Sequence, residues 1–421
     1  MMTEWRKSTW GDEISLEYGK ALRDYDKSGG KYRVFGSNGP IGWTEKSLVQ
    51  GPGIILGRKG AYRGVEYWKS SFFVIDTAYY VVPKSKLDLR WLYYAIKHHK
   101  LGELDDGSPI PSTTRAAVYV KNLEIPSLEE QRAIANILGS LDDKIELNRR
   151  MNETLEGIAR ALFKSWFVDF DPVRAKMDGR QPHGMTPEIA ELFPSEFDHV
   201  NGELVPKGWR IRRIGDVAHR VTKGDTPRKE ALTAAGENEP VVPMLRVNAI
   251  TEDGEILNGK FEYIPESIHF GKSKRSILQE NDILYTNAGT IGRVALVHRD
   301  LLPANTNQAI AIVRPNVQEV PPVFLYMQLR QPEFQAELHC DIVQAVQANL
   351  ALGKIADAVA IFPPSSTICN LISPVGSVLE RIWSNRRESA SLMVIRDTLL
   401  PKLLSGELRV PNAEKLVEEV L

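Results

Sequence analysis

The sequence predicts a mixed α/β (α+β) protein, in which two copies of one globular domain are separated by two long helices that pair in antiparallel fashion. Three features lead to this prediction: an internal repeat, a heptad pattern in the repeated segment, and short strand-like runs upstream of each copy. The length of 421 residues also favours several domains, because one domain usually takes roughly 100–200 residues. We expect, in chain order, a first globular domain at 1–126, a first helix at 127–167, a linker at 168–205, a second globular domain at 206–362, and a second helix with a C-terminal segment at 363–421.

The internal repeat is most regular in the helical segments. An offset of 237 residues places Pro126 on Pro363 and aligns the following residues without gaps. The matches are Gly139-Ser140 with Gly376-Ser377, Ile145 with Ile382, Asn148-Arg149-Arg150 with Asn385-Arg386-Arg387, and Leu155, Ile158 and Leu162 with Leu392, Ile395 and Leu399. The upstream segments match more loosely. The duplication therefore predicts an internal pseudo-twofold repeat.

The first globular domain combines strand-like and helical segments. Apolar runs rich in β-branched and aromatic residues lie between Gly and Pro signals at 54–56, 72–75 and 79–82, and a helical pattern covers 89–100. Residues 1–126 carry a net charge of +5, whereas residues 127–200 carry −5. Random scatter is one explanation of this difference. The other is that contact with a polyanion is assigned to particular surfaces.

The segment 127–167 predicts a spacer helix, because apolar residues recur in a heptad pattern. One set is Ile134, Leu141, Asn148, Leu155 and Leu162, and the set four residues later is Leu138, Ile145, Asn152, Ala159 and Trp166. An amphipathic helix lying on one domain is the alternative. A helix of this length would extend roughly 55 Å, however, which is too long for a small domain to cover.

The following segments repeat this order. Residues 168–205 are rich in Pro, Gly, Asp and His, which is typical of a linker, with one helical candidate at 186–193. The second globular domain has strand-like runs at 283–285 and 309–313 and a helical pattern at 323–331.

The second helix carries the heptad sets again. They are Leu371, Val378, Asn385, Leu392 and Leu399, with Val375, Ile382, Ser389, Arg396 and Leu403 four residues later. Pro374 predicts that this helix begins near Ser373, and Pro401 predicts a kink or a stop. In a fully overlapped antiparallel pair Asn148 would approach Asn385, and a buried polar pair of this kind costs stability but fixes the register.

Charge and composition exclude several classes of protein. Lys and Arg total 53 against 54 Asp and Glu, a net charge of −1, so the chain is less basic than one that binds nucleic acid by charge alone. Cys340 and Cys369 cannot form a disulfide framework or a four-thiolate zinc site, which indicates a reducing compartment. The N-terminal segment lacks the apolar core of a signal peptide, and no stretch is typical of a membrane span, so we expect a cytoplasmic protein.

The sequence contains no recognisable catalytic motif. Gly271-Lys272-Ser273 is similar to the end of a phosphate-binding loop, but Glu266 occupies the position of the required glycine. HExxH, CxxC and the Asn/Asp-Pro-Pro-aromatic motif of amino-group methyltransferases are absent. We therefore expect a binding or scaffold protein with no catalytic, cofactor or metal site of its own.

Basic residues next to Gly and polar residues are the candidates for DNA contact, because Arg and Lys bind phosphates and Arg reads guanine edges. They are Lys27, Lys31, Arg33, Arg58, Lys59 and Arg63 in the first domain, and Lys223, Arg228, Lys229, Arg246, Lys272, Lys274, Arg275 and Arg293 in the second. Adenine could be read by Asn38, Asn248, Asn287, Asn307 and Gln308. The alternative is that most of these residues are solvated surface groups.

Five segments carry a resemblance to a known family. They are IPSLEEQRAIANILGSLDDKIELNRRMNETLE, LFKSWFVDFDPVRAKMDG, MTPEIAELFP, VPKGW and the C-terminal TLLPKLLSGELRV. Along its whole length the chain resembles the specificity (S) subunit of type I restriction–modification systems.

The resemblance implies two target-recognition domains, each reading one half of a bipartite site in double-stranded DNA. It implies helical spacers that set the gap between the half-sites and dock two methyltransferase (M) subunits, which motor-nuclease (R) subunits then join. S-adenosylmethionine, ATP and magnesium would belong to those partners, and this chain would be a non-catalytic subunit. Two other classes stay open, namely an orphan coiled-coil adaptor with protein-binding domains and an enzyme with its own methyltransferase or nuclease site.

Overall fold

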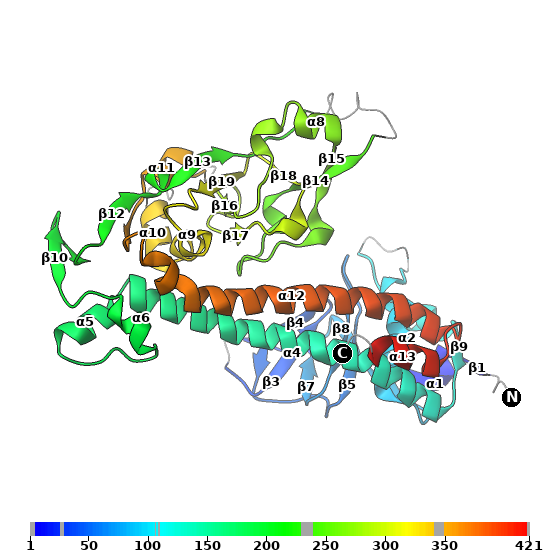
Figure 1. The fold of residues 1–421 in the computed structure, drawn as a ribbon. Helices are drawn as coiled ribbons and strands as arrows, with labels where there is room; N and C mark the ends of the chain where they lie inside the picture. The colour runs from blue at the N-terminus through cyan, green and yellow to red at the C-terminus, as the bar shows by residue number, and fades with distance from the viewer. Residues whose placement is uncertain are drawn as a thin grey trace. The chain divides into compact units, whose positions relative to one another are not determined.

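The structure is a computed structural model that describes residues 5–25, 29–105, 107, 110–228, 239–340 and 349–418. It divides into two compact units (Figure 1). Unit 1 is Met1–Met151 with Ser384–Leu421, and unit 2 is Asn152–Trp383. The division passes through both long helices, so each unit contains a globular part and one stretch of the helix pair.

Unit 1 is built on a four-stranded and a three-stranded sheet. The first has the order β2-β8-β5-β6, formed by β2 (Ile14–Tyr18), β8 (Ala78–Pro83), β5 (Gly53–Gly57) and β6 (Val65–Trp68). The second has the order β4-β3-β7, formed by β4 (Gly39–Thr44), β3 (Tyr32–Gly36) and β7 (Phe72–Val74). A separate antiparallel pair joins β1 (Arg6–Thr9) to β9 (Asn122–Ile125). The shorter helices are α1 (Trp10–Glu13), α2 (Leu89–His98), α3 (Arg115–Tyr119) and α13 (Val410–Glu418), with a 3₁₀ turn at Leu101–Glu103.

Helix α2 shows how local sequence produces these elements. Asp88 caps the helix by accepting hydrogen bonds from the backbone N–H groups of Arg90 and Trp91, at 3.0 and 2.9 Å. The buried side chains of Trp91 and Ile96 join the main core of unit 1, to which both long helices also contribute. The helix predicted at 89–100 is therefore present, and its inner face positions the four-stranded sheet on the helix pair.

Unit 2 repeats this construction. Its four-stranded sheet has the order β13-β19-β16-β17, formed by β13 (Ala218–Lys223), β19 (Ile310–Pro315), β16 (Ile283–Thr286) and β17 (Val294–Leu296). Its three-stranded sheet has the order β15-β14-β18, formed by β15 (Glu262–Pro265), β14 (Val241–Leu245) and β18 (Asn305–Thr306). A further pair joins β12 (Arg210–Arg213) to β20 (Val359–Phe362). The short helices are α8 (Glu266–Phe270), α9 (Pro322–Leu329), α10 (Pro332–His339) and α11 (Leu352–Asp357), with 3₁₀ turns at Ile214–Asp216, Val247–Ala249, Asn258–Lys260, Lys274–Ser276 and Arg299–Leu301.

The two units share one topology, down to single hydrogen bonds. In each three-stranded sheet the central strand is antiparallel to one neighbour and parallel to the other. Gly57 N–H donates to Gly64 O at 2.8 Å, and the equivalent Thr286 N–H donates to Arg293 O at 2.9 Å. The predicted α+β fold with an internal repeat is confirmed.

Two equivalent glycines mark a place where the backbones approach closely. Gly19 follows β2, and a Cβ atom there would lie 2.0 Å from Ile75 O. Gly224 follows β13, and a Cβ atom there would lie 2.1 Å from Asn307 O. Only glycine fits at such a distance, so both units need it where the first strand of the sheet passes the end of β7 or β18.

Within each unit, the stretches of the long helices α4 (Leu128–Phe167) and α12 (Ile368–Leu404) run antiparallel and side by side (Figure 1). In unit 1, Asn148 Nδ2 donates to the backbone oxygen of Asn385 at 3.4 Å, and both residues are buried, as the heptad argument predicts. Of the predicted packing residues, Ile134, Leu138, Leu141, Asn148, Ile382, Asn385, Leu392 and Leu399 are buried, and Ile145, Leu155, Leu162 and Val378 are partly buried. No helix in the described ranges is long and apolar enough to cross a membrane.

The start predicted for the second helix is wrong. The helix begins at Ile368, before Pro374, rather than near Ser373. Proline in the second turn removes one backbone hydrogen bond. Ile368, Leu371 and Val375 are buried in the core of unit 2 on either side of it, and this burial offsets the loss.

The segment expected as a linker has more regular structure than its composition indicates. It contains α5 (Asp171–Met177), α6 (Pro187–Glu191) and a hairpin of β10 (Phe197–Val200) and β11 (Glu203–Pro206). Phe170, Phe193 and Trp209 are buried and join the core of unit 2 together with Trp166 of α4. This aromatic cluster ties the segment to the end of the first long helix.

Candidate nucleic-acid interface

Strand ends gather at one edge of the framework in each unit, which we call the loop edge. In unit 1, β2 and β5 are both antiparallel to β8, so both end where β8 begins. β3 and β7 end there too, because Ile75 N–H donates to Phe35 O and Lys20 N–H donates to Val74 O, each at 2.9 Å. The loop edge of unit 1 therefore carries the residues that follow β2, β3, β5 and β7.

Tyr18, the last residue of β2, is flanked at this edge by two guanidinium groups. Cζ of Arg58 lies 5.0 Å and Cζ of Arg115 lies 4.3 Å from the centroid of its ring. Both cations are held by backbone oxygens, since Arg58 donates to Asp76 O at 2.9 Å and Arg115 donates to Leu16 O at 2.6 Å. Tyr18 is 47% exposed. An exposed aromatic ring between two fixed cations can stack on a nucleotide base while the cations bind a neighbouring phosphate.

Tyr79 supports this cluster from the core. Its ring centroid lies 5.1 Å from that of Tyr18, and its hydroxyl donates to Thr113 O at 3.3 Å. Burial, followed by the hydrogen bond with Tyr18, raises the pKa of Tyr79 to about 12. The phenol is therefore neutral at physiological pH and adds no negative charge to the edge.

Lys59 adds an exposed cation to the same edge. Its backbone N–H donates to Ser37 Oγ at 3.1 Å and to Thr77 O at 3.2 Å, which fixes the loop after β5. The Lys59 side chain is exposed, and Tyr62, three residues further on, is 77% exposed.

The loop edge of unit 2 carries a basic cluster around one carboxylate. Asp225, two residues after β13, accepts hydrogen bonds from Arg275 Nη2 at 2.8 Å and from Ser273 Oγ at 3.3 Å. The predicted contact residues that meet here are Lys223, Lys272, Lys274 and Arg275, all of them exposed. The positive charges outnumber the single carboxylate, so this surface attracts anions.

Equivalent positions at the two loop edges hold different side chains. Thr113 N–H donates to Arg58 O at 2.9 Å, and Leu350 N–H donates to Asn287 O at 2.8 Å, so Asn287 takes the place of Arg58. Lys223 takes the place of Tyr18, because each precedes its close-approach glycine. One backbone framework thus presents two different sets of chemical groups.

Other predicted contact residues lie elsewhere or have structural roles. Lys31 and Arg33 lie at the start of β3, and Arg33 Cζ is 4.8 Å from the ring centroid of Trp43. Arg63 donates to Gly60 O, Gly102 O and Leu104 O, and Arg293 donates to Ile250 O at 2.7 Å. These guanidinium groups hold loops together.

Three further candidates follow strands at the loop edge of unit 2. Arg246 and Asn248 follow β14 and are exposed, and Arg246 pairs with Glu262 at 2.7 Å. Arg228 is exposed beyond β13. Lys27 and Lys229 lie outside the described residues.

Sequence reasoning missed Tyr18, Arg115 and Asp225. Tyr18 precedes Gly19, and Asp225 follows Gly224, which are the glycines after the first strand of each four-stranded sheet. This repeated glycine is a signal that the sequence contains. Arg115 lies far along the chain from Tyr18, and only the fold brings them together.

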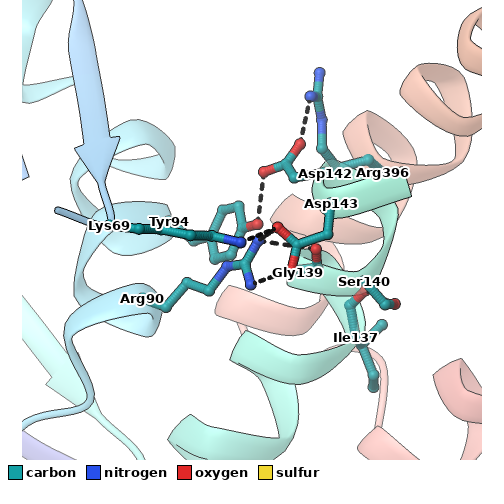
Figure 2. Close-up of polar contacts among 9 residues, drawn as sticks. All are labelled: Lys69, Arg90, Tyr94, Ile137, Gly139, Ser140, Asp142, Asp143 and Arg396. Atoms are coloured by element: carbon teal, nitrogen blue, oxygen red, sulfur yellow. Dashed lines mark hydrogen bonds and ion pairs between the residues drawn. The ribbon is translucent and has the colours of Figure 1, made fainter. Parts of the chain in front are cut away.

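A polar joint connects the globular part of unit 1 to its long helices (Figure 2). Asp143 of α4 accepts hydrogen bonds from Arg90 of α2 at 2.8 and 2.9 Å and from Lys69 at 2.7 Å. Arg90 also donates to Gly139 O at 2.8 Å. The hydrogen bond from Arg90, with help from Lys69, lowers the pKa of Asp143 to about 2.

The neighbouring carboxylate extends this joint to α12. Asp142 accepts hydrogen bonds from the Tyr94 hydroxyl at 2.6 Å and from Arg396 at 2.8 Å (Figure 2). Burial and the Asp142 carboxylate raise the pKa of Tyr94. The joint therefore fixes α2, α4 and α12 against one another within unit 1.

The chain thus repeats one α+β framework and carries different side chains at the same strand ends. A sequence model of the type I restriction modification DNA specificity domain matches residues 2–157 and 206–368. The chain belongs to this family, and it is a specificity subunit of the type I restriction–modification class.

Known relatives agree with this assignment. The chain is 30% identical over 344 residues to the HindI type I restriction enzyme specificity subunit of Haemophilus influenzae, covering 71% of each chain. It is 27% identical over 422 residues to the MjaIX specificity subunit of Methanocaldococcus jannaschii, covering 96% of this chain and 89% of the relative. Its fold is similar to the crystal structure of a type I S subunit from M. genitalium, with a TM-score of 0.60, 18% identity and coverage of 95% and 96%.

Proposed function

We propose that each unit of this DNA specificity subunit reads one half of a bipartite site through its loop edge. The observation that carries the proposal is the shared framework with different side chains at equivalent positions, Tyr18 and Arg58 in one unit against Lys223 and Asn287 in the other. A common scaffold gives both units the same way of approaching a groove. Different side chains at its edge then select different bases.

The antiparallel helices act in this proposal as the spacer between the half-sites. Contacts to phosphates supply affinity, and contacts to base edges supply selection. The nearly neutral net charge of −1 fits a subunit that binds DNA tightly only together with its partners.

The proposed partners are two M subunits docked on the helical spacers, with R subunits joining them. S-adenosylmethionine, ATP and magnesium are assigned to those partners, and this chain contributes recognition alone. A reducing cytoplasm is the proposed compartment, because the two cysteines of the sequence cannot form a disulfide framework.

Footprinting of the complex of this chain with its M subunits tests the proposal. We expect protection of two short DNA segments separated by an unprotected gap, at the sequence that the complex methylates. Protection without sequence preference, or no DNA binding, would favour the adaptor with protein-binding domains. Transfer of a labelled methyl group by the isolated chain would instead identify an enzyme and refute the assignment of catalysis to the partners.

A further inference from the structure

We infer that residues 271–276 of unit 2, the basic loop, bind backbone phosphates of the DNA duplex, and that Asn305 positions this loop. The inference rests on the proposed function and adds which element binds phosphate. It also separates the roles of the two units, because the basic loop has no counterpart of the same length in unit 1. The segment between the equivalent strands spans residues 266–282 in unit 2 and only residues 45–52 in unit 1.

The basic loop contains exposed cations and buried hydroxyl groups. Lys272, Lys274 and Arg275 are exposed, whereas Ser273 and Ser276 are fully buried. The buried serines fix the loop, and the three cations remain exposed to solvent. A loop held in this way loses little conformational freedom when an anion binds.

Asn305 of β18 is the anchor of the basic loop. Its buried Nδ2 donates to Ser273 O at 3.1 Å and to Ser276 Oγ at 2.9 Å, and its Oδ1 contacts Nδ1 of the buried His269. Ser276 Oγ donates in turn to Ser273 O at 2.8 Å. The amide therefore closes the loop without touching any of its cations, which makes Asn305 a positioning residue.

The charges at the basic loop favour phosphates over base edges. Arg275 already shares its guanidinium with Asp225 at 2.8 Å, which orients it but leaves a half-exposed cation. Lys272 and Lys274 are flexible point charges, and such ammonium groups bind phosphate without the fixed bidentate geometry of an Arg guanidinium. Lys223, at the end of β13, adds a further exposed cation beside Asp225.

The experiment measures how DNA affinity depends on salt, using the complex with M subunits and a duplex that carries the methylated site. Lys272→Gln and Lys274→Gln are made singly and together. The slope of log affinity against log salt is expected to fall by about 0.9 for each phosphate contact removed, so by roughly twice that in the double variant. The methylated sequence is expected to stay unchanged, because phosphates carry no sequence information.

Arg210→Gln is the matched control, because Arg210 is exposed in β12 of the same unit, away from the loop edge. It removes the same charge and is expected to leave the slope unchanged. Asn305→Ala removes no charge and is expected to lower the affinity through disorder of the basic loop. If its circular dichroism shows loss of the fold, Ser276→Ala tests the same anchor with a smaller change.

Three results overturn the inference: an unchanged slope in the double lysine variant, an equal fall with Arg210→Gln, or an altered methylated sequence. The last would mean that the lysines read bases. A wild-type complex that binds the site no better than a scrambled duplex would instead refute the proposed function, so the two failures are distinguishable.

Discussion

The carboxylate of Asp143 links helix α4 to Arg90 of helix α2 and to Lys69 through ion pairs. Its folded-state pKa of about 2 lies below the ordinary value of 3.8. Between these pH values the unfolded chain binds more protons than the folded one, so stability rises with pH across this window. The Asp143 side chain is 44% exposed, and solvent screening reduces its contribution to about 1 kcal/mol.

Asp143→Asn is therefore expected to lower the free energy of unfolding by about 1 kcal/mol at neutral pH. The deficit should be constant above about pH 4 and close as the pH falls toward 2, because the wild-type carboxylate is then protonated. Urea denaturation at a series of pH values measures it. Asp76→Asn is the control, since Asp76 is exposed and its carboxylate makes no hydrogen bond or ion pair with the residues that the structure describes; a deficit of equal size there, or one independent of pH, would contradict the assignment.

For single residues, the sequence identifies basic side chains but does not predict which of them are exposed. Arg63 and Lys59 look alike in the sequence, as basic residues beside glycines. In the fold, Arg63 donates to three backbone oxygens, whereas Lys59 stays exposed. The difference depends on carbonyl groups supplied by Gly102 and Leu104, which are distant in sequence, and no local pattern reports it.

At the scale of elements, heptad periodicity predicted the helix pair well, because burial along a long helix follows a fixed period. The polar layer at Asn148 is more elaborate than the sequence indicates. Its Nδ2 also donates to Glu388 Oε2 at 2.8 Å and to Ser389 Oγ at 3.3 Å. The start of α12 was predicted wrongly, because the cost of Pro374 is local while the burial that offsets it comes from the core of unit 2.

Replacing Asn148 and Asn385 together by Leu is expected to raise the stability of the helix pair by about 1–2 kcal/mol and to weaken its register. Thermal unfolding measures the first effect. Disulfide trapping measures the second, in a chain whose Cys340 and Cys369 are replaced by Ala. Asp142→Cys with Arg396→Cys reports the native register, because these side chains are in contact, and Asp142→Cys with Leu400→Cys reports a shift of one turn.

The trapping experiment can either support or contradict a role of Asn148 and Asn385 in setting the register. Trapping at residues 142 and 400 should increase only when the asparagines are replaced. If stability and trapping both match the parent chain, the polar layer does not set the register.

At the scale of the whole molecule, duplication explains how one chain carries two readers. The same strand order occurs twice, and each unit contributes a stretch of both long helices. α4 passes from unit 1 to unit 2 after Met151, and α12 returns after Trp383. Length added at these two positions therefore falls between the units and disturbs neither core.

Insertion of one heptad after Met151 and another after Trp383 lengthens the helix pair by roughly 10 Å while keeping the apolar stripe in phase. If the helices are the spacer, the gap in the methylated site should grow by about three base pairs, at roughly 3.4 Å per pair, with both half-sites unchanged. Methylome sequencing of cells that express the variant complex measures this. A seven-residue Gly-Ser insertion between α5 and α6 is the control and should change neither half-site nor gap. Altered half-sites with an unaltered gap would contradict the proposal that the helices set the distance between the half-sites.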